Sequence, residues 1–371
     1  MQNLVLKNLE LVHFKNHKSA HWDFNSKVNI ITGSNGNGKT NVLDAIHYLS
    51  FTKSYLNSVD SQNITHGEQM SLIKGVFDRF DAETVVDLGL KKGQKKVVRV
   101  AGKEVEKLAN HIGYIPVVMI TPSDRDLIMD AAEIRRRFIN STVSQNNAQY
   151  LHALMGYQRA LQQRNTLLKY FASNRTFDPE MLAVYNDQLV EHADTVYQGR
   201  KGFIEALEPE LQRFYEALSG GKEKVQLRYK SALNDNSMEE ILEENLDKDR
   251  VMQYTTSGLH RDDAVFQLEG HSIKKLGSQG QQKSFLIALK LAQFELTRDA
   301  LGIRPLLLLD DIFDKLDEGR VSNLLGLVHS DDFGQIFITD THTERMTELS
   351  KNLRLNHNTF EICDNGQVQA I

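Results

Sequence analysis

The segment IITGSNGNGKT, residues 30–40, contains the residue types and spacing that most directly predict chemistry. From position 33 it matches G-x-x-x-x-G-K-[ST], between a β-branched run and a helical pattern. Glycines let successive backbone N–H groups point at phosphate oxygens, at the positive end of a helix dipole. A glycine-rich turn without a ligand is the alternative. The pattern predicts a nucleoside triphosphate site made of Gly33, Ser34, Asn35, Gly36, Asn37, Gly38, Lys39, Thr40 and Asn41.

Metal binding and catalysis are predicted from this segment and from a second one, RPLLLLDDIFDKLD. Lys39 would reach the β- and γ-phosphates, and the Thr40 hydroxyl would bind Mg²⁺. Residues 306–309 read as a strand buried on both faces, which ends in two acids. Asp310 would hold Mg²⁺ through its hydration shell, and Asp311 would orient or polarise the attacking water. An acidic pair that caps the next helix is the alternative.

The segment SQGQQ at residues 278–282 predicts a second anion site. Ser278, Gly280 and Gln281 come directly before a helix with an apolar face, and a serine and backbone amides at a helix N-terminus bind anions. One triphosphate does not need two complete helix N-termini and a lysine from the same chain. A second copy of the chain would therefore supply this site. A plain N-cap followed by a solvated glutamine pair is the alternative.

Hydrophobic periodicity divides the chain into three parts. Residues 1–121 show short alternating runs typical of strands, and residues 122–222 show apolar positions at helical spacing, with breaks near 145–147 and 173–179. Strand patterns return within residues 223–371. An α/β ATPase that is interrupted by a helical arm of up to about 60 Å is expected.

The composition limits the class of protein. The chain has 371 residues, a formal net charge of −5, a single cysteine at Cys363 and no long apolar run. A cytoplasmic protein without a membrane partner is the simplest interpretation, and the negative net charge counts against a protein coated all over in positive charge. Nucleic-acid contacts would have to be local. The candidates are Arg135, Arg136, Arg137, Arg159, Arg164, Lys95 and Lys96, and the alternative is that these cations neutralise neighbouring acids or are solvated.

These motifs together resemble the RecF family, within the SMC-like group of ATP-binding-cassette ATPases. The resemblance spans the chain and rests on VHFKNH, GSNGNGKTNVLDAI, ITPSDRDLIMDAAEIRRRFIN, TTSGLHRDD, SQGQQK and LLLLDDIFDKLDEGR. It implies that residues 33–40 are the Walker A loop, residues 278–281 the signature motif, and Asp310 and Asp311 the Walker B pair. It also implies that residues 314–317 form a loop at a dimer interface. Asp340 or His342 would be the switch residue, and residues 63–69 are one candidate segment for the Q-loop, whose position the motifs do not fix.

The family resemblance also implies a fold and a function. The fold would be an ATP-binding-cassette head, with a mixed sheet around the P-loop helix and an inserted helical arm. ATP and Mg²⁺ would be the cofactors, and the ATP-bound form would be a homodimer with weak, DNA-stimulated ATPase activity that serves as a switch. The dimer would bind duplex DNA near single-strand gaps and act with RecO and RecR to load RecA.

Two other classes of P-loop protein remain as alternatives. A transporter ATPase subunit would need a membrane partner and an obvious switch histidine after the strand at 336–339. A small-molecule kinase would work as a monomer and would not need the SQGQQ segment.

Overall fold

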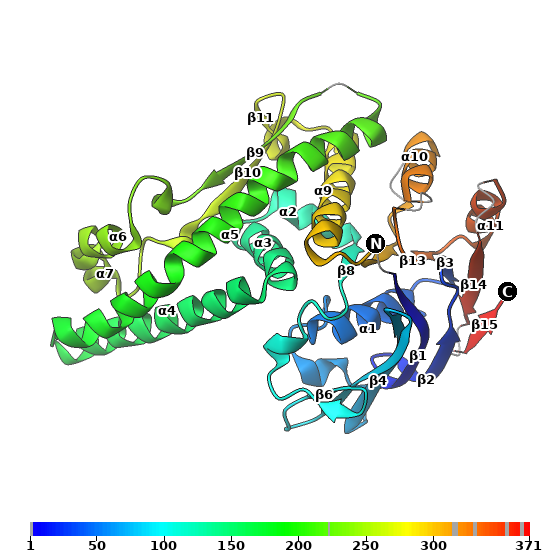
Figure 1. Cartoon of the computed structure of the whole chain (residues 1–371), viewed down its shortest axis with the longest axis horizontal. Coiled ribbons are helices and arrows are strands. Elements are labelled where there is room, and N and C mark those ends of the chain that lie inside the picture. The colour runs from blue at the N-terminus through cyan, green and yellow to red at the C-terminus, as the bar shows by residue number, and fades with distance from the viewer. Residues whose placement is uncertain (1–2, 222, 314–317, 329–331, 353–355, 364–366) are drawn as a thin grey trace. The chain divides into compact units, whose positions relative to one another are not determined.

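The computed structural model of the chain describes residues 3–221, 223–313, 318–328, 332–352, 356–363 and 367–371 (Figure 1). Its contacts divide the chain into two compact units. Unit 1 comprises Met1–Asp124, Phe214–Gly221 and Lys283–Ile371, and unit 2 comprises Arg125–Arg213 and Lys222–Gln282. The predicted arm ended at residue 222, whereas the segment that follows, up to Gln282, groups with the helices.

The P-loop follows β3 of a six-stranded mixed sheet in unit 1, whose strand order is β15-β14-β3-β13-β12-β8. All neighbouring pairs are parallel except β14 and β15. Every residue of β3, β8, β12 and β13 is buried, which explains their continuous apolar runs. The bounds are β3 Val28–Thr32, β8 Val117–Ile120, β12 Leu306–Asp310, β13 Ile336–Asp340, β14 His357–Ile362 and β15 Val368–Ala370.

A second sheet of unit 1 is antiparallel, with the order β2-β1-β4-β5-β6-β7. Its strands alternate buried and more exposed residues, as in β4, because one face covers the core. The bounds are β1 Leu4–Phe14, β2 His17–Asp23, β4 Met70–Arg79, β5 Ala82–Lys91, β6 Val97–Val100 and β7 Lys103–Glu104.

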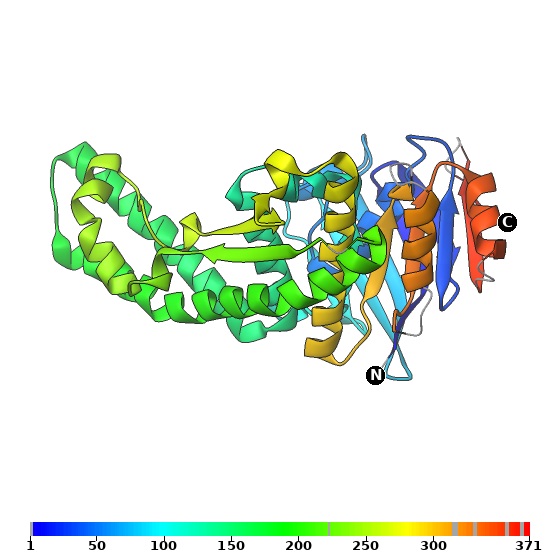
Figure 2. The ribbon, with the colours of Figure 1, turned by 90° about the horizontal axis from the view of Figure 1, so that it is seen from above.

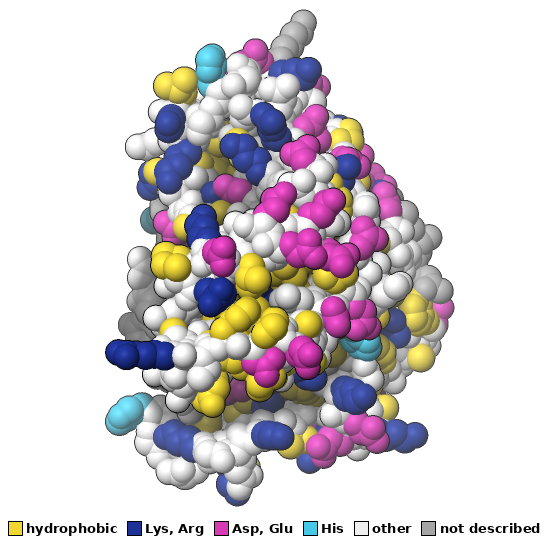
Figure 3. Space-filling model, turned by 90° about the vertical axis from the view of Figure 1, so that its left-hand side faces the viewer, with side chains coloured by type: hydrophobic (Ala, Val, Ile, Leu, Met, Phe, Trp, Pro, Cys, Tyr) yellow, Lys and Arg dark blue, Asp and Glu magenta, His cyan; other side chains and the backbone are white. Residues whose placement is uncertain are grey.

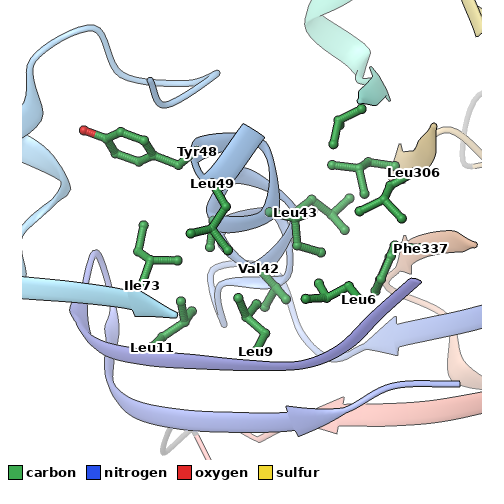
Figure 4. Close-up of a cluster of buried hydrophobic side chains, with 14 of the residues drawn as sticks. Leu6, Leu9, Leu11, Val42, Leu43, Tyr48, Leu49, Ile73, Leu306 and Phe337 are labelled. Atoms are coloured by element: carbon green, nitrogen blue, oxygen red, sulfur yellow. The ribbon is translucent and has the colours of Figure 1, made fainter. Parts of the chain in front are cut away.

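Helix α1 (Lys39–Phe51) lies between these two sheets (Figure 4). Val42, Leu43 and Leu49 are fully buried in one cluster with side chains from both sheets: Leu6, Leu9, Leu11, Ile73, Leu306 and Phe337. Burial of apolar surface on both sides stabilises the helix at about 25 cal/mol per Å². The helix that follows the P-loop is thereby fixed to the sheet that carries the acidic strand end. Helices α10 (Glu318–Val328) and α11 (Thr343–Asn352) also belong to unit 1.

Unit 2 contains a helical hairpin, α4 (Ala148–Asn174) followed by α5 (Pro179–Ser219), whose last turns belong to unit 1 (Figure 2). The chain breaks at Asn147, whose side chain caps α4, and at residues 175–178, as the periodicity predicted. The strands of the three-stranded sheet β11-β10-β9 run beside α5, because Glu208 and Gln212 accept the outward N–H groups of Leu227 and Val225. The remaining bounds are α2 Asp126–Met129, α3 Ala132–Asn146, β9 Val225–Lys230, α6 Met238–Glu244, α7 Leu246–Met252, β10 Asp263–Leu268, β11 His271–Ser272, α8 Ile273–Leu276 and α9 Gln279–Leu301, which crosses into unit 1.

A buried ion pair joins α4 to α7 within unit 2. Arg164 is fully buried, and its Nη1 donates to Asp249 Oδ2 and to Thr255 Oγ1, both at 2.7 Å. Asp249 also accepts the N–H and the hydroxyl of Thr256. These partners compensate the cost of removing two charges from water.

We expect Arg164→Met to lower the free energy of unfolding by about 3–5 kcal/mol, because Asp249 would become an unpaired buried charge. The matched control is Arg159→Met on the exposed side of the same helix, which should change it by less than about 0.5 kcal/mol. Urea unfolding followed by circular dichroism measures both. Equal effects of the two substitutions would contradict the structural role of Arg164.

Candidate functional site

The P-loop connects β3, at the centre of the parallel sheet, to the N-terminus of α1. Gly38 is the residue before the helix and has a φ of 96°, which favours glycine. A Cβ at this position would lie 2.4 Å from the side-chain amide of Asn16, so a side chain there would also collide. The first turn of α1 carries no acid, and Gly38 offers no side chain to cap it. The helix N-terminus is therefore suited to an anionic ligand.

Lys39 is held over the loop that precedes it. Its Nζ donates to the carbonyl oxygens of Gly33 at 2.7 Å and Ser34 at 3.1 Å, and the residue is 7% exposed. The ammonium group thus lies within the loop, where it can exchange carbonyl oxygens for phosphate oxygens. This geometry fits the phosphate-binding role that the spacing predicts.

The tip of the β1–β2 hairpin supports the P-loop from outside. Nε2 of His17 lies 3.1 Å from the Gly38 carbonyl oxygen, and Nδ2 of Asn16 donates to Gly36 O at 3.4 Å. Asn41, in the first turn of α1, donates to Asn16 Oδ1 at 2.7 Å. Burial lowers the pKa of His17, which favours the neutral ring at this position. Asn16 and His17 belong to the VHFKNH motif, but sequence reasoning gave them no role at the site.

Asp310 and Thr40 meet at the carboxyl edge of the parallel sheet. Thr40 Oγ1 and Thr339 Oγ1 both donate to Asp310 Oδ1 at 2.8 Å. This meeting follows from the strand register, in which Asp310 pairs with Thr339 and Asp340 with Thr32. The donor set, a hydroxyl next to a carboxylate, fits Mg²⁺, which prefers oxygen ligands and is completed by phosphate oxygens and water. Thr339 was not predicted; its only signal is a polar residue near the end of an apolar strand.

Burial is the main cause that raises the pKa of Asp310 above its ordinary value of 3.8. The hydrogen bonds from Thr339 and Thr40 act in the opposite direction, and the negative charge of Asp311 raises the pKa further. A proton therefore competes with a metal ion for this carboxylate at a higher pH than it would for an exposed one.

Asp311 turns the chain away from the sheet. Its φ is 48°, and its N–H donates to Thr339 Oγ1 at 3.0 Å. The Asp311 backbone is thus held against β13, and Asp311 is the next residue in the sequence after Asp310, the candidate metal ligand. The loop at 314–317, predicted to lie at a dimer interface, is outside the described residues.

The residues after β13 form a compact turn around Asp340. This fully buried carboxylate accepts the N–H of His342 at 2.7 Å and pairs with Arg345 Nη2 at 2.5 Å. The His342 side chain is exposed. Asp340 therefore organises the turn, and Arg345 is a cation near this strand end that the sequence did not indicate. The choice of switch residue stays a prediction. Residues 63–69, the candidate Q-loop segment, lead into β4 of the antiparallel sheet, and the position of the Q-loop also stays a prediction.

Ser278 caps α9 in unit 2, where it forms a reciprocal pair with Gln281. The Ser278 hydroxyl accepts the N–H of Gln281 at 3.2 Å, and Gln281 Oε1 accepts the N–H of Ser278 at 2.7 Å. Gln281 Nε2 also donates to Glu223 at 2.5 Å. Ser278 is exposed, so its hydroxyl can be reached by a ligand from outside the chain. Gly280 lies in the first turn of the helix.

Four of the predicted DNA contacts are used inside the protein, and this corrects the sequence interpretation. Arg135 forms two bonds to Asp263, at 2.7 and 3.1 Å, and Arg136 donates to the Asp262 carbonyl oxygen at 2.6 Å. Arg164 is buried in the ion pair described above. Lys96 donates to Thr52 O and pairs with Asp60 at 3.0 Å. These cations cannot reach a DNA phosphate without losing their partners.

Arg137, Arg159 and Lys95 are exposed and remain candidates for DNA contacts. Arg137 pairs with Glu133 at 3.0 Å, but both side chains are 70% exposed, so the pair is weak. The face drawn in Figure 3 carries many acidic side chains. Exposed acids of unit 2 include Glu239, Glu240, Glu243, Glu244 and Asp247 on α6 and α7. We do not expect DNA phosphates to bind next to these two helices.

Comparison with known proteins agrees with this geometry. The RecF/RecN/SMC N terminal domain family matches residues 5–362. The DNA replication and repair protein RecF of Flavobacterium johnsoniae is 48% identical over 96% of this chain and 99% of its own length. The protein of the same name from Phocaeicola vulgatus is 43% identical, over 98% of both chains.

The chain belongs to the RecF family. A solved structure described as the recombination mediator protein RecF-ATPrS in the RecFOR pathway aligns with a TM-score of 0.89 and 26% identity, over 100% of this chain and 99% of that one. The Smc head domain of Pyrococcus furiosus aligns with a TM-score of 0.58 and 15% identity, which shows a shared α/β fold alone. The predicted RecF-like ATPase head with a long helical insert is thus confirmed. None of the helices in the described ranges has the length and apolar content needed to span a membrane.

We expect binding of Mg²⁺–ATP to weaken as the pH falls, and to do so at a higher pH than for an ordinary exposed aspartate, because Asp310, whose pKa is raised, takes up a proton and loses its affinity for the metal. Isothermal titration at several pH values measures this. Asp310→Asn is the control, because it keeps the titration of the nucleotide itself and removes that of the carboxylate. Identical pH dependence in the two proteins would contradict the role of Asp310.

Proposed function

We propose that this RecF-family protein is an ATP-dependent DNA-binding protein of recombinational repair and replication restart. It binds ATP and Mg²⁺, forms a homodimer in that state, and contacts duplex DNA near single-strand gaps. The proposal rests on the presence of two features in one chain. The chain has a complete phosphate-binding loop before α1, and it also has an exposed helix N-terminus capped by Ser278, which that loop does not require to bind a triphosphate. The relatives named DNA replication and repair protein RecF, and the solved RecF with ATPrS, support the same assignment.

The residues of unit 1 have distinct roles in this proposal. The N–H groups at the start of α1 and the Lys39 ammonium bind the β- and γ-phosphates. Thr40 and Asp310 hold Mg²⁺, which would neutralise charge on the phosphate oxygens. Asp311, fixed through its backbone to Thr339, orients and polarises the attacking water. Asn16 and His17 keep the loop in the shape that these contacts require.

Dimer formation follows if Ser278 of one chain contacts the nucleotide on the other. ATP bound in this way exists only in the dimer, so its binding free energy stabilises the dimer by mass action. Hydrolysis removes the terminal phosphate from the shared site, and the chains separate. The ATPase activity then acts as a switch, and slow turnover is sufficient.

The DNA contacts are proposed at exposed cations, Arg137, Arg159 and Lys95. Contacts of this kind are independent of base sequence, and their affinity falls with salt. By resemblance to the family, RecO and RecR are the proposed protein partners, and loading of RecA is the proposed outcome. We also propose a cytoplasmic location, where the single cysteine would remain reduced.

Gel filtration or mass photometry tests the dimer. With Asp311→Asn, which slows hydrolysis, we expect ATP to double the mass, and we expect Ser278→Arg to abolish this change because a bulky cation would occupy the helix tip. Lys39→Ala, which removes a phosphate contact, is the control for nucleotide dependence. A mass that does not respond to ATP would favour the kinase alternative, since a kinase acts as a monomer.

Binding to gapped and to fully duplex DNA, with and without ATP, tests the proposed DNA contacts. We expect ATP to increase affinity for gapped DNA and Arg159→Glu to reduce it by about tenfold, with a smaller salt slope. Glu244→Gln, in the acidic α6, is the matched control and should have little effect. An affinity that does not change with salt would remove Arg137, Arg159 and Lys95 from consideration.

A further inference from the structure

A cavity of about 600 Å³ lies where the helical hairpin of unit 2 turns, and the function proposed above does not use it. The end of α4, the loop that follows this helix, and α7 line the cavity. Leu168 and Phe171 belong to the buried apolar cluster of the hairpin, and Phe177 packs against that cluster. Ligand pockets of proteins have volumes of roughly 300–1,000 Å³. The cavity is therefore large enough for an apolar side chain and the backbone that carries it.

The walls of this cavity are held in place by contacts within unit 2. The Thr176 N–H donates to the Phe171 carbonyl oxygen at 3.1 Å, and the rings of Phe171 and Phe177 pack edge to face at 5.5 Å. The other wall, α7, is fixed to α4 by the buried ion pair of Arg164 and Asp249. Because these walls are ordered before a ligand arrives, a ligand that binds there pays little for ordering them.

Two arginines line the cavity, and their donors can reach a ligand. Arg250 lies over the ring of Phe177, 4.0 Å from its centroid, so the ring covers a face of the guanidinium group and leaves the N–H groups in its plane. Its ion pair with Asp247 is 3.5 Å long, and the two side chains are 45% and 96% exposed, so this pair is weak. The exposed Arg175 side chain has no hydrogen-bond or ion-pair partner among the described residues. Carboxylates and phosphates are the groups that guanidinium donors recognise best.

Acidic side chains near the cavity limit the charge of its ligand. Asp247 lines the cavity, and α6, the helix that contacts α7, carries the exposed residues Glu239, Glu240, Glu243 and Glu244. Figure 3 faces the side of the molecule where α6 and α7 lie, and it shows acidic side chains next to apolar ones. These acids repel a polyanion such as DNA or a run of acidic residues, whereas a single carboxylate can lie between two arginines.

An exposed valine indicates that the ligand is also apolar. Val251 lines the cavity beside Arg250 in the sequence, and 79% of it is exposed to solvent. Covering it removes apolar surface from water, which favours an apolar ligand. The cavity thus combines apolar contacts with donors for one carboxylate.

We propose that this cavity binds the C-terminus of a partner protein whose last residue is large and apolar. The side chain of that residue would contact Leu168 and Phe171, and its carboxylate would pair with Arg175 and Arg250. The C-terminus is the place in a protein where an apolar residue itself carries a carboxylate, and capture of that group is a known mode of peptide recognition. The inference goes beyond the proposed function and does not depend on ATP, because every lining residue belongs to unit 2.

Fluorescence anisotropy with the full chain tests this proposal. The probe is a fluorescein-labelled hexapeptide of glycine and serine that ends in leucine and phenylalanine with a free carboxylate. We expect the free acid to bind at least about tenfold more tightly than the same peptide with a C-terminal amide, because charge-assisted hydrogen bonds to the carboxylate are lost in the amide. Replacing the last phenylalanine by serine should abolish binding of the acid.

Substitutions of the arginines separate carboxylate recognition from a structural role. We expect Arg250→Gln and Arg175→Gln each to lower the affinity for the acid by about tenfold and to leave the affinity for the amide within about twofold. The matched control is Lys248→Gln, which removes an exposed cation from the same short helix without lining the cavity; it should change neither affinity by more than about twofold.

Four outcomes would overturn the proposal. Wild type could bind neither peptide, or it could bind the acid and the amide equally. Arg250→Gln could weaken both peptides by the same factor, which would show a structural role alone. A short DNA duplex, or N-acetylphenylalanine at the concentration of the peptide, could displace the probe, which would show a phosphate site or a small-molecule site instead. None of these measurements uses ATP, so a failure of ATP-dependent dimerisation would leave this proposal standing.

Discussion

The convergence of four parallel strand ends at one sheet edge is the constraint on which the rest of this molecule depends. Parallel pairing of β3, β13, β12 and β8 places the P-loop, Thr339 and Asp310 at the same edge. The Asp310 carboxylate then joins three of these segments through two hydroxyl groups, each at 2.8 Å. Burial raises the free-energy cost of ionising the Asp310 carboxylate when it has no partner. A metal ion at this carboxylate offsets that cost, so the site favours metal binding.

The same sheet edge is close in sequence to a point where the chain passes from unit 1 to unit 2. The loop after β8 leads directly into unit 2, and α9 returns from unit 2 into unit 1. The segment after β8 therefore starts at the nucleotide edge and ends in unit 2, whereas α9 runs from unit 2 to the start of β12, at the opposite edge of the sheet. In the proposed function, loss of a terminal phosphate would change the charge at this edge, close in sequence to the point where the chain leaves β8 for unit 2. The proposed switch would act through this change of charge.

Sequence reasoning found the parts of the site that depend on local patterns. The P-loop, the acidic end of β12 and the break at Asn147 follow from glycine spacing, apolar runs and capping residues, all of which act over a few positions. It could not separate structural from exposed arginines. Arg135 and its partner Asp263 are 128 residues apart, and Arg164 and Asp249 are 85 apart, so only the tertiary fold reveals that these charges are neutralised. Thr339 and the Asn16–His17 support of the P-loop were missed for the same reason.

The central claim is that each nucleotide is shared by two chains, and mixing two inactive variants tests it most directly. Lys39→Ala keeps Ser278 intact, and Ser278→Arg keeps the P-loop intact. A mixed dimer has one site with both parts intact and one site with neither. The account predicts that ATP hydrolysis, absent from each variant alone, returns in the mixture to at most about half of the wild-type rate per dimer. A mixture that remains as inactive as its components would contradict it.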